Sequence, residues 1–407
     1  MALLDRPLNR RSNGIKDSEV PKYVGKLKGF LGHEALAKAQ ADLDKDLAHH
    51  GCCYRNWAQE LRPWLFAFRM YDQETKNGVH MPNKWPMEIR ELAGDALMIA
   101  SLHSGMPEEV KAKYRKDLLL RQHNDFMVEI HAAWHYHLEG YDVQWYPLGH
   151  TKCPEFRVQG EGLDFDVECR RFGWDMSDHV KNPAIADICD TIYDVILAHG
   201  LWGEVRVEFS DNFRFDPGRT QQWSQALAHA LVATQTTIKL DSRVLLTLEL
   251  KPSPSRKYTQ DELVDLARNQ QHPESSFLQS KREGELGFDP VVFRCCGPRK
   301  TPEELRDYIY KTLKKKVSTQ LSTNRPGVAV VRFSGIRDPN VFSDSEGMKD
   351  ALRKLFGRRH LAAIVLKCDG LTETGAIDIL HSTPAIVFRN PETDFPRVAV
   401  AQHLSQQ

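Results

Sequence analysis

The sequence predicts an α/β protein in which a sheet is flanked by helices. Three stretches carry that prediction: residues 33–122 have helical spacing, residues 141–171 have the pattern of three short strands, and residues 287–407 alternate strands with helices. The strands of the last stretch, such as 361–367, are almost wholly apolar. Strands of that kind are typical of a sheet covered on both faces.

Composition and charge narrow the class of protein. A chain of 407 residues is expected to fold into two or three domains. Lys+Arg 55 equals Asp+Glu 55, so a nucleic acid would have to be held by local basic patches. We find no long apolar run and no signal-peptide pattern, and therefore expect a cytoplasmic protein without a membrane segment. None of the eight cysteines forms a CxxC pair, which argues against a zinc ribbon or a disulfide framework.

Five regions follow one another along the chain. The expected regions are a basic flexible segment at 1–32, a helical region at 33–122, an α/β core with a candidate insertion at 123–250, a polar loop-rich linker at 251–286, and an α/β region at 287–407 that is a candidate to complete the core.

Start and stop signals place the elements after the third strand. The best marked is a helix that begins at Thr301, where Thr301 and Glu304 form a capping box around Pro302. Apolar strands alternating with helices favour a parallel sheet in this part of the chain. The other expected elements are helices at 183–199, 217–234 and 344–356 and strands at 203–209, 243–250, 289–294, 327–333, 361–367 and 384–389.

The most informative stretch is 141–171, because its last two strands carry polar side chains on one face. Side chains repeat every two residues along a strand, so the polar and apolar series lie on opposite faces. Carboxylates crowded on one face repel each other unless a cation lies among them, and hard oxygen ligands suit Mg²⁺ or Mn²⁺. The polar series is Glu155, Arg157 and Gln159 on the second strand and Asp164, Asp166, Glu168 and Arg170 on the third.

The order of these residues is similar to that of a known family. A helix with Glu129 leads to Pro154-Glu155 and then to Glu168-Cys169-Arg170, which resembles the PD-(D/E)XK nuclease superfamily. In that family a helix with a glutamate precedes a hairpin that carries Pro-Asp and then Asp/Glu-x-Lys. Glu155 stands here for the aspartate and Arg170 for the lysine. The resemblance covers residues 120–172 closely and 301–335 loosely. In that family the core continues after the Asp/Glu-x-Lys strand with a helix and then a strand. The resemblance therefore implies that either 301–335 completes the core, which makes 173–300 an insertion, or the helix 183–199 and the strand 203–209 do so.

The resemblance implies a restriction-endonuclease-like fold, with a mixed sheet, and a metal-dependent endonuclease. Glu155, Glu168 and the carbonyl of Cys169 would hold Mg²⁺ or Mn²⁺. Arg170 would contact the scissile phosphate and Glu129 would assist. The expected reaction is hydrolysis of phosphodiester bonds, with DNA favoured over RNA, in nucleic-acid defence or repair.

Arg170 is also the reason for a competing hypothesis. Arginine stays protonated and is a poor general base, so the resemblance is compatible with a catalytically silent nuclease fold. Such a protein would bind nucleic acid or act as a scaffolding subunit. A third interpretation is that the acidic face binds a metal only for stability.

Basic side chains elsewhere are further candidates. Lys314, Lys315 and Lys316, with Gln320 close by, would suit contact with a nucleic-acid backbone. The alternative is the solvated face of an amphipathic helix. Lys152 lies just before Pro154 in the sequence and could replace the missing lysine.

Two histidines and the helical region leave further alternatives open. His131 and His135, one helical turn apart, either bind zinc or are packed and hydrogen-bonded in a core. The helical region 33–122 covers the core, binds a protein partner or guides a substrate. A homo-oligomer is compatible with the sequence.

Overall fold

The chain forms two compact units, each assembled from separated segments. The first contains Met1–Ala41, Leu61–Met176 and Thr301–Gln407, and the second contains Asp42–Glu60 and Ser177–Lys300. The computed structural model describes residues 15–48, 50–76, 85–120, 123–148, 153–173, 182–210, 213–252, 275–280, 290–297, 300–334, 346–368, 370–374, 378–382 and 385–399.

The expected helical region is confirmed, and it begins earlier than expected. The helix Val20–Leu31 lies inside the segment predicted to be flexible, and it forms because Val20, Val24, Leu27 and Leu31 repeat along one buried face. Residues 1–14, which carry several of the N-terminal basic side chains, lie outside the described ranges. The helices are α1 (Val20–Leu31), α2 (His33–Ala48), α3 (Cys52–Leu61), α4 (Pro63–Lys76), α5 (Met87–Leu102), α6 (Glu108–Asp117) and α7 (His123–Leu138).

The first unit contains a mixed six-stranded sheet in the order β1-β2-β3-β9-β10-β13. The neighbours β3, β9 and β10 are parallel, whereas β1-β2, β2-β3 and β10-β13 are antiparallel. The C-terminal part of the sheet was expected to be parallel, but its edge strand β13 is antiparallel to β10. The strands are β1 (Asp142–Trp145), β2 (Phe156–Gly160), β3 (Leu163–Phe172), β9 (Gly327–Phe333), β10 (Leu361–Cys368) and β13 (Ala385–Arg389).

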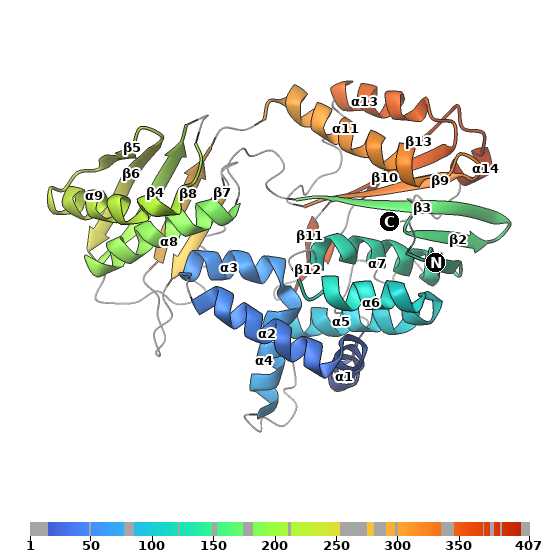
Figure 1. Ribbon diagram of the computed structural model, residues 1–407, viewed down its shortest axis with the longest axis horizontal. Coiled ribbons are helices and arrows are strands. Elements are labelled where there is room, and N and C mark those ends of the chain that lie inside the picture. Colours follow the sequence, from blue (N-terminus) through green and yellow to red (C-terminus); the bar gives the residue numbers. More distant parts are fainter. Residues whose placement is uncertain are drawn as a thin grey trace. The chain divides into compact units, whose positions relative to one another are not determined.

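Helices cover both faces of this sheet (Figure 1). The helices α11 (Pro302–Gln320) and α13 (Glu346–Phe356) lie on one face, and α7 lies on the other. The apolar stripe of α11 packs against β3, β9 and β10, and the expected capping box at Thr301 is present. The chain also forms the hairpin β11 (Gly370–Thr374) and β12 (Asp378–Ser382) and the short helix α14 (Pro396–Ala399).

The β2–β3 hairpin turns through two residues, Glu161 and Gly162. Their φ values are 51° and 72°, the left-handed conformation that two-residue hairpin loops require. Gly162 adopts it without strain, whereas Glu161 does so against its steric preference. The turn fixes the register that pairs Gly160 with Leu163 and Phe156 with Val167. The motif residues on the two strands therefore come side by side.

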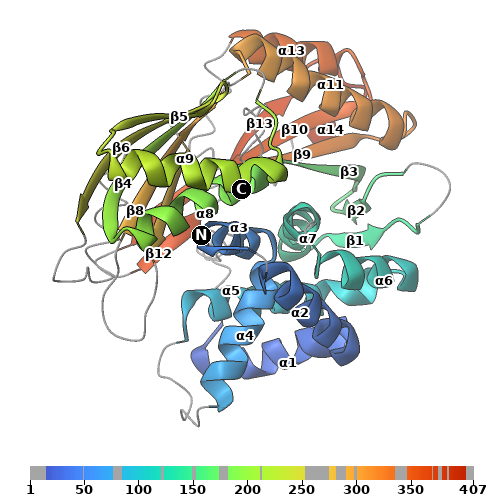
Figure 2. The ribbon, with the colours of Figure 1, turned by 60° about the vertical axis from the view of Figure 1, so that its left-hand side comes forward.

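The second unit has a sheet of its own, in the order β5-β6-β4-β8-β7. Figure 2 shows the helices α8 and α9 lying across one face of it. Its elements are α8 (Asn182–Ala198), β4 (Leu201–Phe209), α9 (Thr220–Val232), β5 (Thr237–Asp241), β6 (Val244–Pro252), β7 (Ser275–Ser280) and β8 (Pro290–Cys296).

This second sheet decides between the two connections left open by the sequence. The strand β4 pairs with β6 and β8, while β9 pairs with β3. The segment 301–335 therefore completes the core, and the alternative that used 183–199 and 203–209 is wrong. The units also cut across the expected ranges 123–250 and 287–407, because β6 and β8 belong to one sheet, on either side of β4.

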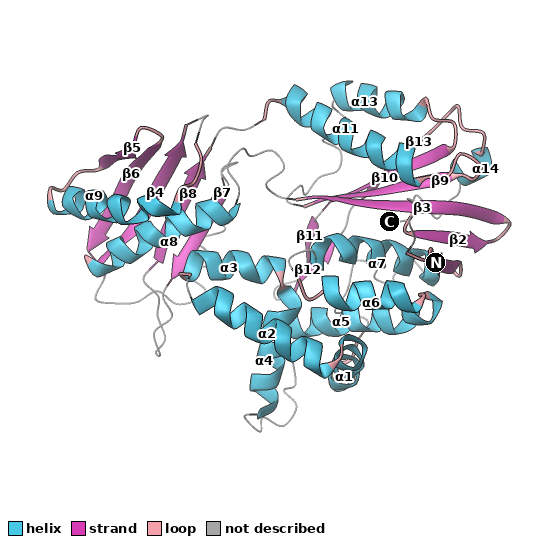
Figure 3. Ribbon diagram, in the orientation of Figure 1, coloured by secondary structure: helices cyan, strands magenta, loops and turns pink. Residues whose placement is uncertain are grey.

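Both units contain helices and strands (Figure 3). In the described part of the chain, no helix is both long and apolar enough to cross a membrane.

Candidate functional site

The hairpin places the carboxylates of Glu155 and Glu168 next to each other. The backbone N–H of Glu155 donates to the carbonyl of Val167 at 3.1 Å, which ties the start of β2 to β3. The backbone N–H of Cys169 donates to Glu155 Oε2, also at 3.1 Å. The Glu155 carboxylate is thus held beside the strand position that carries Glu168. The expected pair of acidic residues is brought together.

Glu168 is almost completely buried, with 2% of its surface exposed. Burial raises the pKa of its carboxyl group strongly, and the neighbouring Glu155 raises it further. When both groups are ionised, Glu168 Oε2 has no hydrogen-bond donor within the described ranges. Two carboxylates that face each other need a proton or a cation between them. The pair is therefore a place where a cation would bind.

Lys316 of α11 is the cation that the chain itself brings to this pair. Its Nζ lies 2.6 Å from Glu168 Oε1 and 3.7 Å from Glu155 Oε1. Burial lowers the pKa of Lys316, but Glu168 and Glu155 outweigh that effect, so the pKa lies above its usual value. The side chain keeps 27% of its surface exposed, so the pair is open to solvent on the lysine side.

The lysine cluster of α11 does not act as one surface. Lys314 and Lys315 are exposed, as the solvated-face alternative expects, and the ammonium of Lys314 lies over the ring of Tyr310. Lys316 instead turns toward the sheet. Its role in the site was missed because the sequence offers three consecutive lysines. One signal was available: Lys316 lies three residues after the buried Leu313 and beside the buried Val317.

Glu129 approaches the same pair from α7. The hydroxyl of Tyr114 donates a short hydrogen bond to Glu129 Oε2, and the indole of Trp145 donates to the Tyr114 oxygen at 3.2 Å. Burial of the carboxyl and the nearby charge of Glu155 raise the pKa of Glu129 to about 8. At neutral pH Glu129 is therefore mainly protonated and hydrogen-bonded, which distinguishes it from an ionised ligand.

Two polar groups beside the pair are buried without partners. Within the described residues, neither Arg170 Nε nor Gln320 Oε1 has a hydrogen-bond partner. Gln320 lies one turn after Lys316 on α11, and Arg170 shares the strand face of Glu168. Buried polar groups normally find a partner, so these two are available to a ligand.

The thiol of Cys169 takes no part in this arrangement. Burial raises its pKa well above the ordinary value, with Glu155 and Glu129 adding to the effect. It is buried on the strand face opposite to Glu168. Only the backbone of Cys169 faces the pair, as its N–H contact with Glu155 shows.

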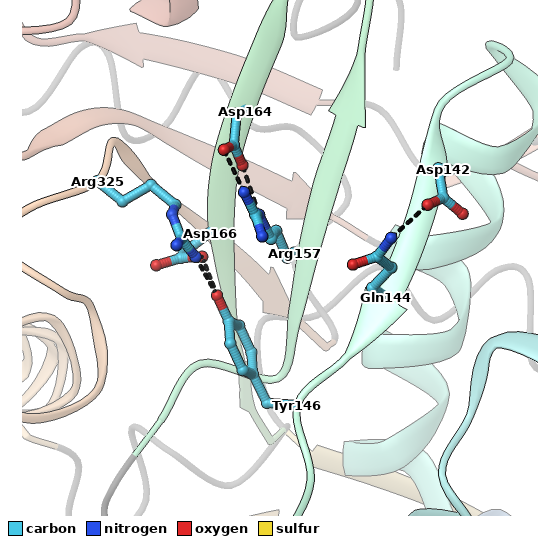
Figure 4. Close-up of polar contacts among 7 residues, drawn as sticks. All are labelled: Asp142, Gln144, Tyr146, Arg157, Asp164, Asp166 and Arg325. Carbon is cyan, nitrogen blue, oxygen red and sulfur yellow. Dashed lines mark hydrogen bonds and ion pairs between the residues drawn. The ribbon is translucent and has the colours of Figure 1, made fainter.

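The aspartates earlier on β3 are paired with arginines (Figure 4). Asp166 is buried and accepts a hydrogen bond from Tyr146 at 2.6 Å, and Arg325 Nη1 lies 3.2 Å from the same oxygen. Asp164 forms a two-point contact with Arg157. Both carboxylates therefore already pair with an arginine, and neither is available to replace Glu155 or Glu168 as a metal ligand.

The other candidates lie apart from the pair. His131 Nδ1 lies 3.2 Å from Arg332 Nη1, and its Nε2 lies 3.6 Å from Asp95 Oδ1. His135 is buried. Within the described ranges no three His, Cys, Asp or Glu side chains form a metal-binding group. Lys152 lies outside the described residues.

Comparison with known proteins identifies no relative: no family model, no curated protein and no solved structure matches the chain. Two carboxylates and a backbone carbonyl are donors of the kind that Mg²⁺ prefers, and Mg²⁺ commonly binds one or two carboxylates and keeps several waters. The unsatisfied oxygen of Glu168 fits such an ion.

Proposed function

We propose that the protein is a metal-dependent nuclease that hydrolyses phosphodiester bonds, with DNA favoured over RNA. One observation carries the proposal: Lys316 lies against both Glu155 and Glu168. The resemblance to the PD-(D/E)XK superfamily lacked its lysine, because Arg170 stands in the motif position. A lysine supplied by α11 completes the set of two carboxylates and one ammonium from another element of the fold.

The fold is consistent with the same proposal. A helix with Glu129, the hairpin with the carboxylate pair, then α11 and the parallel strand β9, follow one another as the resembled core requires. The insertion of 177–300 explains why the sequence resemblance was interrupted. Overall charge balance remains compatible with a nucleic-acid substrate held by local groups.

Each side chain receives a role from its position. Glu155, Glu168 and the Cys169 carbonyl would hold Mg²⁺ or Mn²⁺. Bound there, the ion would lower the pKa of a water molecule and neutralise charge on the phosphate. Lys316 and Arg170 would donate hydrogen bonds to the phosphate oxygens. Glu129, held protonated beside Tyr114, would position the Glu155 carboxylate.

The alternative is a catalytically silent fold that binds nucleic acid or another protein. The contact between Lys316 and Glu168 favours it, since the ammonium already neutralises the carboxylate without a metal. In that case the three groups would form a structural ion pair, and metal would change neither binding nor stability. The two hypotheses differ in what Lys316 does rather than in where it lies.

Cleavage assays with matched lysine variants test the proposal. Linear, circular and single-stranded DNA and RNA are incubated with Mg²⁺, Mn²⁺ or chelator. Wild type, Glu168→Ala, Lys316→Met and Lys315→Met are compared, the last being an exposed lysine of the same helix. We expect metal-dependent cutting that falls about a hundredfold or more in Glu168→Ala and Lys316→Met. Lys315→Met should cut like wild type.

Other outcomes would redirect the assignment. Cutting that survives Lys316→Met would remove the lysine from the chemistry and leave Arg170 as the basic group. If wild type cuts none of these substrates with any metal while Arg170→Lys does, the site is a nuclease silenced by one residue. If no variant cuts, the silent alternative is favoured.

A further inference from the structure

A second polar feature lies on the same sheet, away from the carboxylate pair. Arg171, Arg332 and Lys367 are each the second-last residue of their strands, β3, β9 and β10. The strands are parallel neighbours, and their register pairs Arg171 with Arg332 and Arg332 with Lys367. Three basic residues therefore form one row across the carboxyl end of three adjacent strands. We call it the basic row.

The basic row faces α7 rather than α11. The next residue of each strand, Phe172, Phe333 and Cys368, belongs to the core that β3, β9 and β10 form with α11 and α13. Successive side chains of a strand point to opposite faces, so the basic row points to the other side of the sheet. Two contacts with α7 agree: Arg171 Nη1 lies 3.5 Å from Asp125, and Arg332 Nη1 lies 3.2 Å from His131.

The charge of Arg171 in the basic row is only partly balanced. Asp125 is about half exposed, which weakens its pairing with Arg171. Arg171 Nε donates a hydrogen bond to the neutral hydroxyl of Ser334 at 2.9 Å. On the other side of His131, Nε2 lies 3.6 Å from Asp95 Oδ1, and the second oxygen of Asp95 accepts a hydrogen bond from Trp64. Directly opposed like charges on adjacent strands are destabilising unless something compensates them.

Lys367 is the most deeply buried residue of the basic row. Only 7% of its surface is exposed, and its backbone pairs with that of Arg332. Burial, with the charge of Arg332, lowers the pKa of Lys367 to about 8, so the ammonium is still the main form at neutral pH. Among the described residues, no carboxylate lies within 4.0 Å of its Nζ. A buried lysine of this kind normally has an acid partner.

We propose that the basic row is a binding site for a phosphate group. Two guanidinium groups and an ammonium suit the several oxygens of a phosphate, and the Ser334 hydroxyl adds a neutral donor. The site lies where ligands of open α/β sheets commonly bind, outside the carboxyl ends of parallel strands. It does not depend on hydrolysis at the carboxylate pair, which lies on the opposite face of the sheet.

The phosphate can come from three sources, which the experiment separates. A 3′-fluorescein single-stranded oligonucleotide is prepared with a 5′-phosphate or with a 5′-hydroxyl. Its binding to the full-length protein is followed by anisotropy, in chelator and at fixed low salt. Inorganic phosphate is titrated separately by calorimetry. The variants are Lys367→Met and, as control, Lys354→Met, which removes an exposed lysine of α13.

We expect Lys367→Met to weaken phosphate binding about tenfold or more, because a buried charged contact is lost. Lys354→Met should bind like wild type. A preference for the 5′-phosphate would identify a strand end. Equal binding of both oligonucleotides would identify the backbone. Binding of inorganic phosphate alone would identify a free anion.

Two results would overturn the proposal. One is that wild type binds none of the three probes, and the other is that Lys367→Met binds all of them as wild type does. Methionine is similar in length and apolar, so Lys367→Met should keep the melting temperature of wild type or raise it. If that variant does not fold, Arg332→Gln replaces it under the same criterion.

Discussion

The protonation of Glu129 gives the sharpest test of the site's electrostatics. Glu129→Gln keeps the shape of the side chain and replaces a titrating group by a neutral one. The amide oxygen can still accept the hydrogen bond from Tyr114, and the amide N–H₂ can face Glu155 as the protonated carboxyl does. The substitution therefore removes the proton equilibrium while keeping the contacts.

The size of the effect follows from the raised pKa. The pKa of Glu129 is about 8 in the folded protein, compared with an ordinary value of 4.5. At pH 7 the folded protein holds a proton that the unfolded chain has lost. This lowers the unfolding free energy by about 1.4 kcal/mol for each pH unit above the ordinary pKa, which amounts to roughly 3 kcal/mol at pH 7. Glu129 as a residue keeps some exposed surface, so we expect about 2–3 kcal/mol.

The direction of the effect on stability and the pH range in which it develops follow from the same pKa shift. A carboxyl whose folded pKa is raised contributes its stability below the unfolded pKa and loses it as pH rises through the folded pKa. Glu129→Gln should therefore match wild type near pH 4.5, become progressively more stable than wild type up to about pH 8, and keep a constant advantage above it. The direction is unusual, because a buried site residue is replaced with a gain in stability.

Urea unfolding at pH 5, 6, 7, 8 and 9 in chelator measures this difference, with tryptophan fluorescence as the probe. Glu109→Gln, an exposed glutamate of α6, is the matched control and should show no pH-dependent difference. A difference in unfolding free energy between Glu129→Gln and wild type that stayed the same from pH 5 to pH 9 would contradict the raised pKa of Glu129. A loss of stability that grows with pH would show that Glu129 is ionised and paired.

Three further predictions address the neighbouring groups. Lys316→Met should destabilise the metal-free protein by about 2 kcal/mol in urea unfolding, because Glu168 loses its cation. The double variant Lys316→Met with Glu168→Gln should recover most of that loss. Asp166→Asn should lower the unfolding free energy by about 2 kcal/mol, since the buried acceptor of Arg325 and Tyr146 loses its negative charge. An unchanged unfolding midpoint would contradict the pairing. Millimolar Mg²⁺ should raise the melting temperature of wild type and not of Glu168→Ala, and equal shifts would place the ion elsewhere.

Much of the local structure follows from short-range patterns in the chain. The two-residue period of 156–171 and the turn at Glu161-Gly162 are enough to place Glu155 beside Glu168, because pleat and loop length together set the register. The capping box at Thr301 and the apolar stripe define α11 for the same reason. The carboxylate pair was therefore predictable from residues close together in sequence.

The partners of that pair depend on contacts between distant segments. Which of three consecutive lysines turns toward Glu168 is decided by the rotation of α11 against the sheet, and the helical period alone does not specify that rotation. The basic row joins Arg171, Arg332 and Lys367 from strands that only tertiary pairing makes neighbours. The insertion of 177–300 is likewise visible only once β9 is seen beside β3. Local periodicity orients a side chain within its own element, whereas packing between elements determines what that side chain meets.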